Sequence, residues 1–308
     1  MEFTEELRSL KDQLRFTGRL NLPEDFDNVV IAGVGGSGIA GRMLEELYKE
    51  KPVILLTDYE VPDFLTDRSV FIGMSYSGNT EETLATTKLA IERGARVFTV
   101  SSGGELQKYG TQHVKISVQG MNPRSAIGYQ LMLLLTSFGL AKKDELDRTS
   151  NLLAELDDNN DECLAHAKKI ADGKLIPVIY GASPFGSVAY RWKTQFNENA
   201  KVLAYSGSFP EINHNDTMAL AQTHSKHMFY FFAFGSHREK ISKRIRVTAE
   251  VTATDFHTIE PKGRSTVEKL FYLLHYGDYV TYHLGRIRGI DPSDVSKITE
   301  LKNRMAED

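Results

Sequence analysis

The sequence predicts an α/β protein made of parallel sheets that are covered by helices on both faces. Short apolar runs of strand length recur along the 308 residues, and helical patterns separate most of them. This alternation is typical of βαβ units, because a parallel neighbour is reached only through a long crossover. The cycle runs twice, so we expect two doubly wound halves of similar plan, at residues 1–150 and 151–308, although no strong sequence repeat relates them.

The first half is predicted to begin with a short helix and a lead-in over residues 1–28. Its strands are apolar runs bounded by turn residues, and a long apolar helix over about 127–140 closes it. The charged stretch 141–162 fits solvated helix faces with their turn, and it suits a connection between halves. The expected strands are 29–34, 52–57, 69–73, 97–101 and 113–118.

The second half repeats the same alternation. A helix is expected at about 187–196, directly after the first strand and its turn, and another at about 265–286. A short segment, Arg288–Pro292, then leads to a charged terminal helix. The expected strands are 175–180, 201–205, 227–234 and 254–259.

Composition excludes several classes of protein. The net charge of −4 and a pI near 6.2 argue against a partner that is nucleic acid or a membrane surface. Cys163 is the one cysteine, which excludes an intramolecular disulfide and a multi-cysteine metal site and fits a reducing compartment. The charged start of the chain shows no signal peptide, and no apolar run reaches membrane-spanning length, so we expect a cytoplasmic protein. His224 and His227 have a metal-like spacing, but no third ligand is evident, so no metal is expected.

Three hydroxyl side chains gather where the strand at 69–73 meets the helix that follows it. Ser75, Ser77 and Thr80 lie in the segment MSYSGNT, together with Gly78. Such a turn presents unpaired backbone N–H groups and the positive end of the helix dipole, which together favour a phosphate. Ordinary helix capping is the alternative, but capping explains one hydroxyl per helix rather than three in one turn.

A second glycine-rich turn, Gly33–Gly38, follows the first strand. It satisfies the dinucleotide pattern G-x-G-x-x-G, and Asp58 lies where the ribose-binding acid of that pattern would be expected. However, Ser37 adds a hydroxyl to this turn, and parallel neighbouring strands can bring both turns to one phosphate. We therefore expect Gly36 and Ser37 to share a sugar phosphate with the Ser75–Thr80 turn, and no nicotinamide cofactor.

These turns, together with segments of the second half, resemble the sugar isomerase (SIS) superfamily. The likeness is greatest to one branch, the bifunctional phosphoglucose/phosphomannose isomerases, and it covers nearly the whole chain in order. It implies two SIS subdomains and a homodimer whose subunits share their active sites. The segments that carry it in the second half are Phe196–Lys201, Pro210–Asn215, Pro261–Gly263 and Arg288–Pro292.

The resemblance also implies roles for individual residues. Glu198 matches the base that moves a proton between C1 and C2, His214 the histidine that assists ring opening, often from the neighbouring subunit. Lys302 matches a lysine near the ring oxygen, with Lys297 close by in the sequence. Arg124 matches the arginine that stabilises enediolate charge. Such a reaction requires neither a metal nor a redox cofactor.

The implied activity is interconversion of glucose 6-phosphate, and also mannose 6-phosphate, with fructose 6-phosphate. Relatives with both activities carry a threonine shortly after the Arg-Gly-x-x-Pro turn, where this chain has Val295, or Ser296 if the alignment shifts by one residue. A non-catalytic sugar-phosphate sensor remains the alternative. Sensors of this kind usually add a helix-turn-helix domain, which the 28 residues before the first strand cannot hold.

Overall fold

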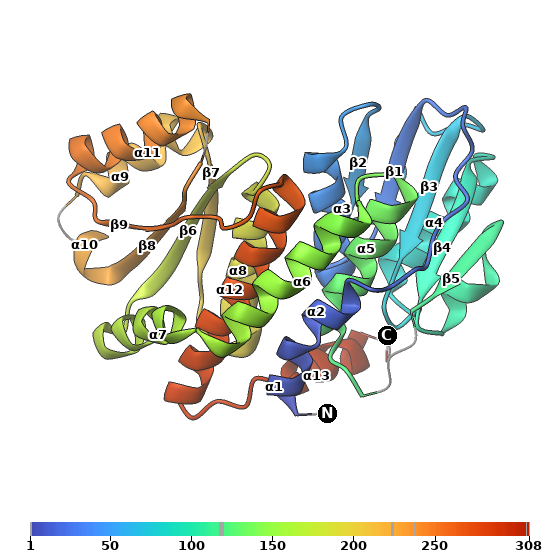
Figure 1. Ribbon diagram of the computed structural model, residues 1–308. Coiled ribbons are helices and arrows are strands. Elements are labelled where there is room, and N and C mark those ends of the chain that lie inside the picture. The colour runs from blue at the N-terminus through green and yellow to red at the C-terminus, as the bar shows by residue number, and fades with distance from the viewer. Residues whose placement is uncertain (1, 117–119, 223–224, 237, 306, 308) are drawn as a thin grey trace. The chain divides into compact units, whose positions relative to one another are not determined.

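The computed structural model describes residues 2–116, 120–222, 225–236, 238–305 and 307. These residues form two compact units, and each unit has its own parallel sheet (Figure 1). Unit 1 comprises Met1–Asp157, Ser183–Ser187 and Lys262–Tyr272, and unit 2 comprises Asp158–Ala182, Val188–Pro261 and Leu273–Asp308. The expected α/β class with two parallel sheets flanked by helices is confirmed.

Unit 1 has a five-stranded parallel sheet with the order β2-β1-β3-β4-β5. Its central strand β3 is buried along its whole length, as expected for an apolar run with helices on both sides. The strands are β1 (Asn28–Ala32), β2 (Val53–Leu56), β3 (Ser69–Met74), β4 (Arg96–Ser101) and β5 (Gln112–Lys115). The helices are α1 (Phe3–Arg8), α2 (Leu10–Gln13), α3 (Gly35–Leu47), α4 (Glu81–Glu92), α5 (Ile127–Ser137) and α6 (Lys143–Asp158), with single turns η1 (Glu105–Lys108) and η2 (Pro123–Ala126).

The strand order of unit 1 reverses between β1 and β3. From β1 the chain moves through α3 to β2 on one side, and from β3 it moves through α4 to β4 on the other side. With right-handed crossovers, α3 and α4 therefore cover opposite faces of the sheet. Such a reversal leaves a crevice beyond the carboxyl ends of the two strands, where α/β proteins bind their ligands.

Unit 2 has a four-stranded parallel sheet with the order β7-β6-β8-β9, so its order reverses between β6 and β8. The core is aromatic: Trp192 stacks on Tyr276 with ring centroids 5.8 Å apart. The strands are β6 (Ile176–Ala182), β7 (Tyr205–Phe209), β8 (Phe229–Phe234) and β9 (Phe256–Ile259). The helices are α7 (Asp161–Gly173), α8 (Gly186–Asn199), α9 (Asp216–Leu220), α10 (Ser225–Met228), α11 (Glu239–Thr252), α12 (Thr266–Ile287) and α13 (Ser296–Met305), with the single turn η3 (Glu211–His214); the starts of α8 and α12 belong to unit 1.

One strand expectation was wrong. Residues 201–204 form no strand, and β7 begins only at Tyr205. Lys201 adopts a left-handed backbone with φ of 51°, two residues after the last residue of α8. Its ammonium donates to the carbonyl oxygens of Glu198 and Asp294, at 2.5 and 2.8 Å. The segment is therefore used to end the helix, and the sheet begins four residues later.

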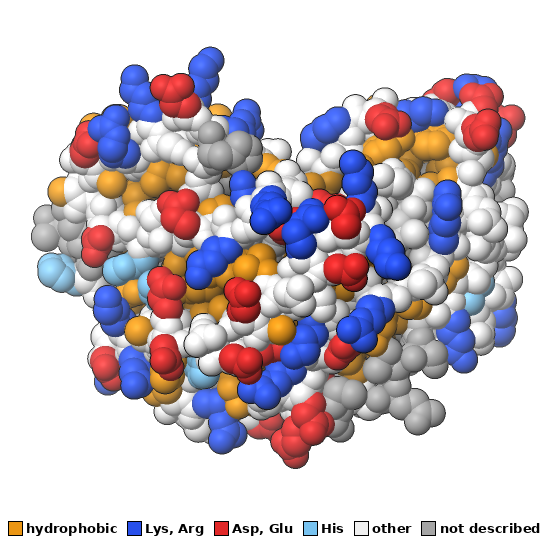
Figure 2. All heavy atoms as spheres, viewed as in Figure 1, with side chains coloured by type: hydrophobic (Ala, Val, Ile, Leu, Met, Phe, Trp, Pro, Cys, Tyr) orange, Lys and Arg blue, Asp and Glu red, His pale blue; other side chains and the backbone are white. Residues whose placement is uncertain are grey.

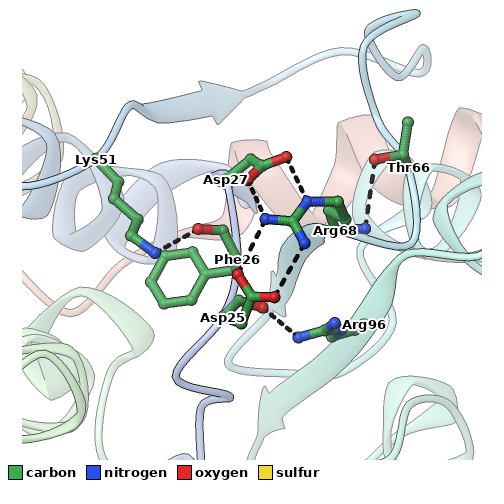
Figure 3. Close-up of polar contacts among 7 residues, drawn as sticks. All are labelled: Asp25, Phe26, Asp27, Lys51, Thr66, Arg68 and Arg96. Carbon is green, nitrogen blue, oxygen red and sulfur yellow. Dashed lines mark hydrogen bonds and ion pairs between the residues drawn. The ribbon is translucent and has the colours of Figure 1, made fainter.

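A network of charges ties loops together at the amino ends of β1, β3 and β4. The guanidinium of Arg68 donates to both carboxylates of Asp25 and Asp27, with N–O distances of 2.7 to 3.0 Å (Figure 3). Arg96 donates to the carbonyl of Asp25 at 2.5 Å, and Lys51 donates to the carbonyl of Phe26. The hydrogen bonds and charge of Arg68 lower the pKa of both carboxyls. This network therefore stabilises the amino ends of these strands, whereas the candidate site lies at their carboxyl ends.

Surface charge follows the composition. Basic and acidic side chains are interspersed over the face drawn in Figure 2, as the totals of 37 Lys and Arg and 41 Asp and Glu would suggest. In the part of the chain that the structure describes, no helix combines the length and apolarity that a membrane span requires.

Candidate active site

The Ser75–Thr80 turn lies at the carboxyl end of β3 and leads into α4. Ser75 is its centre: the Ser75 hydroxyl lies 2.7 Å from the Thr80 hydroxyl and 3.4 Å from the Ser77 hydroxyl, and it accepts the N–H of Gly78 at 3.0 Å. Thr80 occupies the N-cap of α4 but makes no side-chain cap bond. The three hydroxyls are thus joined to one another in one network.

A loop after β4 holds this turn in place, and the sequence reasoning did not single it out. Ser102 donates from its backbone N–H and its hydroxyl to the carbonyl of Tyr76, at 2.8 and 2.7 Å. Gly78 has φ of +72°, and a Cβ there would lie 1.8 Å from the carbonyl oxygen of Gly103. Only glycine fits such a position. The Ser-Ser-Gly-Gly run at 101–104 was the available signal, since it is a third glycine-rich strand end.

The Gly33–Gly38 turn lies beside it, because β1 and β3 are paired neighbours. A Cβ on Gly33 would lie 3.0 Å from the carbonyl of Met74, so the two turns are in direct backbone contact. Ser37 is 5% exposed at the first turn of α3. We call the place where the strand order reverses, beyond the carboxyl ends of β1 and β3, the switch point of the sheet. Backbone N–H groups and hydroxyls meet the positive ends of two helices there. The predicted anchor residues that lie together at this point are Gly36, Ser37, Ser75, Ser77 and Thr80.

Arg124 lies against the same place. A Cβ on Gly36 would lie 3.6 Å from the Arg124 Cα and 3.5 Å from the Pro123 carbonyl oxygen, so the η2 turn packs on the α3 N-terminus. Arg124 is 4% exposed, which is unusual for a guanidinium and indicates that it is held rather than solvated. Unit 1 thus brings together every predicted anchor residue and the predicted cation.

Glu198 lies in unit 2, in the last turn of α8, as the sequence predicted. Its neighbours in the Phe-Asn-Glu-Asn segment fix that helix end. Phe196 is fully buried, Asn197 donates to the carbonyl of Val202 at 2.8 Å, and Asn199 donates to the hydroxyl of Thr281 at 3.0 Å. Only Glu198 in this segment presents a carboxylate, and it is half-buried.

His214 and Lys302 lie on other elements of unit 2. His214 is exposed at the end of η3, after the edge strand β7. Lys302 is exposed on α13, and it makes no ion pair with any residue that the structure describes, whereas Lys297 pairs with Glu300 at 2.8 Å. Val295 is half-buried, and its carbonyl accepts the first hydrogen bonds of α13.

The switch point of unit 2 differs from that of unit 1. After β6, at the position of the Gly33–Gly38 turn, the side chain of Phe185 is buried. After β8, a Cβ on Gly235 would lie 2.2 Å from a carboxylate oxygen of Glu260. A carboxylate thus lies beside the residue that directly follows β8.

Two minor expectations concern a dinucleotide and a metal. The Asp58 carboxylate accepts the N–H of its own neighbour Tyr59 at 2.7 Å. His224 lies outside the described residues, and elsewhere in the described chain no group of three His, Cys, Asp or Glu side chains could hold a metal ion.

Known proteins are similar in sequence to this chain over nearly its full length. A protein of Thermoplasma acidophilum named bifunctional phosphoglucose/phosphomannose isomerase is 52% identical over 99% of this chain and 98% of its own length. The protein of the same name from Thermoplasma volcanium is 51% identical over 99% of this chain and its whole length. This chain belongs to that family. Another member, from Caldicellulosiruptor bescii, is 34% identical and covers 92% of the chain.

The family model of the bacterial phospho-glucose isomerase C-terminal SIS domain matches residues 159–305. Among solved structures, the C-terminal domain of a glucosamine-fructose-6-phosphate aminotransferase from Francisella tularensis has a TM-score of 0.73 with 14% identity, covering 94% of this chain and 95% of its own. A putative phosphosugar isomerase from Clostridium difficile has a TM-score of 0.70 with 14% identity, covering 98% of both chains. These likenesses show the SIS fold. The family that the motifs predicted is confirmed by the relatives named above.

Proposed function

We propose that this protein interconverts glucose 6-phosphate, and also mannose 6-phosphate, with fructose 6-phosphate. The observation that carries the proposal is the contact of two strand-end turns and Arg124 at one switch point, in a chain about half identical to isomerases of that name along its full length. The turns supply donors for a phosphate and the guanidinium supplies a positive charge.

The reaction divides into ring opening and proton transfer. In our proposal Gly36, Ser37 and the Ser75–Thr80 turn hold the phosphate. His214 and Lys302 move a proton to the ring oxygen and away from the C1 hydroxyl. Glu198 then takes the proton from C2 of the open aldose and returns it to C1, and Arg124 faces the negative charge of the enediolate. No electron leaves the sugar in this sequence, so no redox cofactor takes part.

The second part of the proposal is that the enzyme accepts both C2 epimers, glucose 6-phosphate and mannose 6-phosphate. Both activities are in the names of the relatives, and a single base can serve both epimers if C2 can present either face. Val295 lacks the hydroxyl that the resemblance led us to expect after the Arg-Gly-x-x-Pro turn. We propose that mannose 6-phosphate is nevertheless a substrate. A mannose 6-phosphate rate below about a hundredth of the glucose 6-phosphate rate would end this part.

The first test uses Glu198→Gln with fructose 6-phosphate, without added metal, and resolves the product sugars by NMR. We expect kcat to fall about 100- to 10,000-fold, the range for loss of a general base, while inorganic phosphate still competes as in wild type. Glu250→Gln is the matched control, since Glu250 also lies in the last turn of a helix and is exposed. No turnover by wild-type protein, with sugar-phosphate binding intact, would instead favour the sensor.

We further propose a cytoplasmic homodimer in which His214 of one subunit serves the active site of the other. Support comes from the exposure of His214 beside large exposed apolar side chains on the neighbouring elements. Tyr205 is 55% exposed on β7 and Met218 is 77% exposed on α9. Such side chains are expected at a contact between subunits.

A further inference from the structure

The N-terminal helix α1 contacts the turn that carries Arg124. Glu6 is 2% exposed, and its carboxylate accepts the backbone N–H of Asn122 at 3.2 Å and the Asn122 side-chain amide at 3.0 and 3.1 Å. On the same helix, the ring of Phe3 lies 5.3 Å from the Arg124 guanidinium carbon. Residues more than a hundred positions apart thus meet around one functional side chain.

Asn122 connects the two charges. Its amide nitrogen donates to Glu6, and its amide oxygen accepts from the Arg124 guanidinium at 3.4 Å. The orientation of an asparagine amide is set by its network, and here the carboxylate fixes it, because a carboxylate can only accept. The amide oxygen must therefore face the guanidinium. Anion, oriented amide and cation form a polar relay, which we call the Glu6–Asn122–Arg124 relay.

Burial makes this arrangement sensitive to charge. A carboxylate removed from water is costly unless hydrogen bonds compensate it, and Glu6 receives three of them from one residue. Burial, and then the negative charge of Glu6, raise the pKa of the Tyr76 phenol.

We propose that Glu6 is a positioning residue for the isomerase reaction, and that it acts through Asn122 to hold the guanidinium of Arg124, whose backbone packs against Gly36. The ring of Phe3 also lies over this guanidinium. The inference rests on the proposed function, since it assigns Arg124 to the enediolate, and it adds a role for the N-terminal helix that the motifs did not suggest.

The test begins with Glu6→Gln, which keeps shape but places an amide donor against the amide donor of Asn122. We expect kcat to fall about ten-fold, the effect of losing hydrogen bonds that involve charged groups, with KM and phosphate inhibition within about two-fold of wild type. Glu5→Gln is the control, because Glu5 is an exposed residue of the same type on the same helix. Thermal unfolding of both variants separates a positioning effect from loss of fold.

A swap gives the sharper result. In Glu6→Gln combined with Asn122→Asp, the glutamine amide donates to the new carboxylate, which in turn accepts from Arg124, so the relay is rebuilt with the same total charge. We expect kcat to recover to within about three-fold of wild type. In an Arg124→Ala background, Glu6→Gln should cause no further loss of kcat, because the residue through which it acts is absent.

Three outcomes would overturn the inference. Glu6→Gln could behave as Glu5→Gln does, the swap could fail to recover kcat in a folded protein, or Glu6→Gln could cost as much without Arg124 as with it. A wild-type protein without turnover would refute the proposed function instead. The relay is then judged by calorimetry with a five-carbon aldonic acid phosphate, whose carboxylate resembles an enediolate, and equal binding by wild type and Glu6→Gln would refute it.

Discussion

Ser75 shows how one hydroxyl can serve both the fold and the site. It accepts the Gly78 N–H and contacts the hydroxyls of Ser77 and Thr80, and it is 3% exposed. Ser77, by contrast, is exposed, and its hydroxyl accepts only the N–H of Asn79 at 3.2 Å among backbone groups of the turn. Two serines that are two positions apart therefore contribute differently to the structure of the turn.

Alanine substitutions at these two serines should separate the roles. We expect Ser77→Ala to weaken competitive inhibition by inorganic phosphate about three- to ten-fold with little change in melting temperature, since one exposed donor is lost. Ser75→Ala should weaken phosphate to a similar degree and also lower the melting temperature, because the hydroxyl network loses its centre. Equal melting temperatures for both variants would contradict this division.

At the scale of single residues, the sequence was informative where a motif is local. The hydroxyl turn and Glu198 lie within short segments whose spacing carries meaning. Glu6 could not be predicted, because its partner Asn122 is 116 residues away and neither residue belongs to a periodic pattern. A buried carboxylate on a short charged helix has no distinguishing signal in one sequence.

The strand-end turns are the elements that, in our proposal, make unit 1 the phosphate-binding unit. Both sheets reverse order at their centre, and in unit 1 the two strands at the reversal are followed by glycine and hydroxyl residues. The strand and helix pattern predicted both sheets, but it could not predict how side chains lie beside the strand ends. The position of the Glu260 carboxylate beside Gly235, for example, is set by tertiary packing.

The packing of α7 on β8 and β9 makes stability depend on pH. The His166 ring lies 2.7 Å from the Tyr230 hydroxyl through Nδ1, and 5.8 Å from the ring of His257 between centroids. Burial, with the charges of His257 and Lys169, lowers the pKa of His166 to about 4. Burial likewise lowers the pKa of His257, and Asp255 opposes that shift.

Between pH 6.5 and 4 the unfolded chain binds a proton at His166 that the folded chain does not. The stabilisation is therefore fully present above about pH 6.5, and it is lost as pH falls toward 4, amounting to at most about 3 kcal/mol. Urea unfolding of wild type and His166→Gln across this range is the measurement. The variant should show a shallower slope, whereas the exposed control His227→Gln should match wild type. Identical slopes for wild type and His166→Gln would contradict the assignment.

At the scale of the molecule, the proposed homodimer predicts how much activity a dimer of two different inactive variants should have. If His214 acts across the subunit contact, a dimer of one Glu198→Gln and one His214→Ala subunit contains one intact site and one doubly defective site. If His214 acts within its own subunit, every site in the mixture is defective. The two arrangements therefore differ without any knowledge of the contact itself.

Equal amounts of the two inactive variants, dissociated and reassociated together, should recover about a quarter of wild-type activity, since half of the dimers are mixed and each has one working site. Each variant treated alone is the control. Recovery no greater than the sum of the two controls would exclude action across the contact, and a monomeric mass in solution would exclude the dimer.

The hydroxyl network after β3 also has a consequence for the charge state of the substrate. Ser75 and Ser77 already accept backbone N–H groups, and the Ser75 and Thr80 hydroxyls share one proton, so the remaining hydroxyl protons and the surrounding N–H groups are donors for a guest. A phosphate dianion meets donors with all its terminal oxygens, whereas a monoanion brings a proton that needs an acceptor. The second ionisation of a phosphate monoester lies near pH 6. The turn should therefore bind the dianion of the sugar phosphate in preference to the monoanion. KM should rise as the pH falls through this range, even while every protein group keeps its charge.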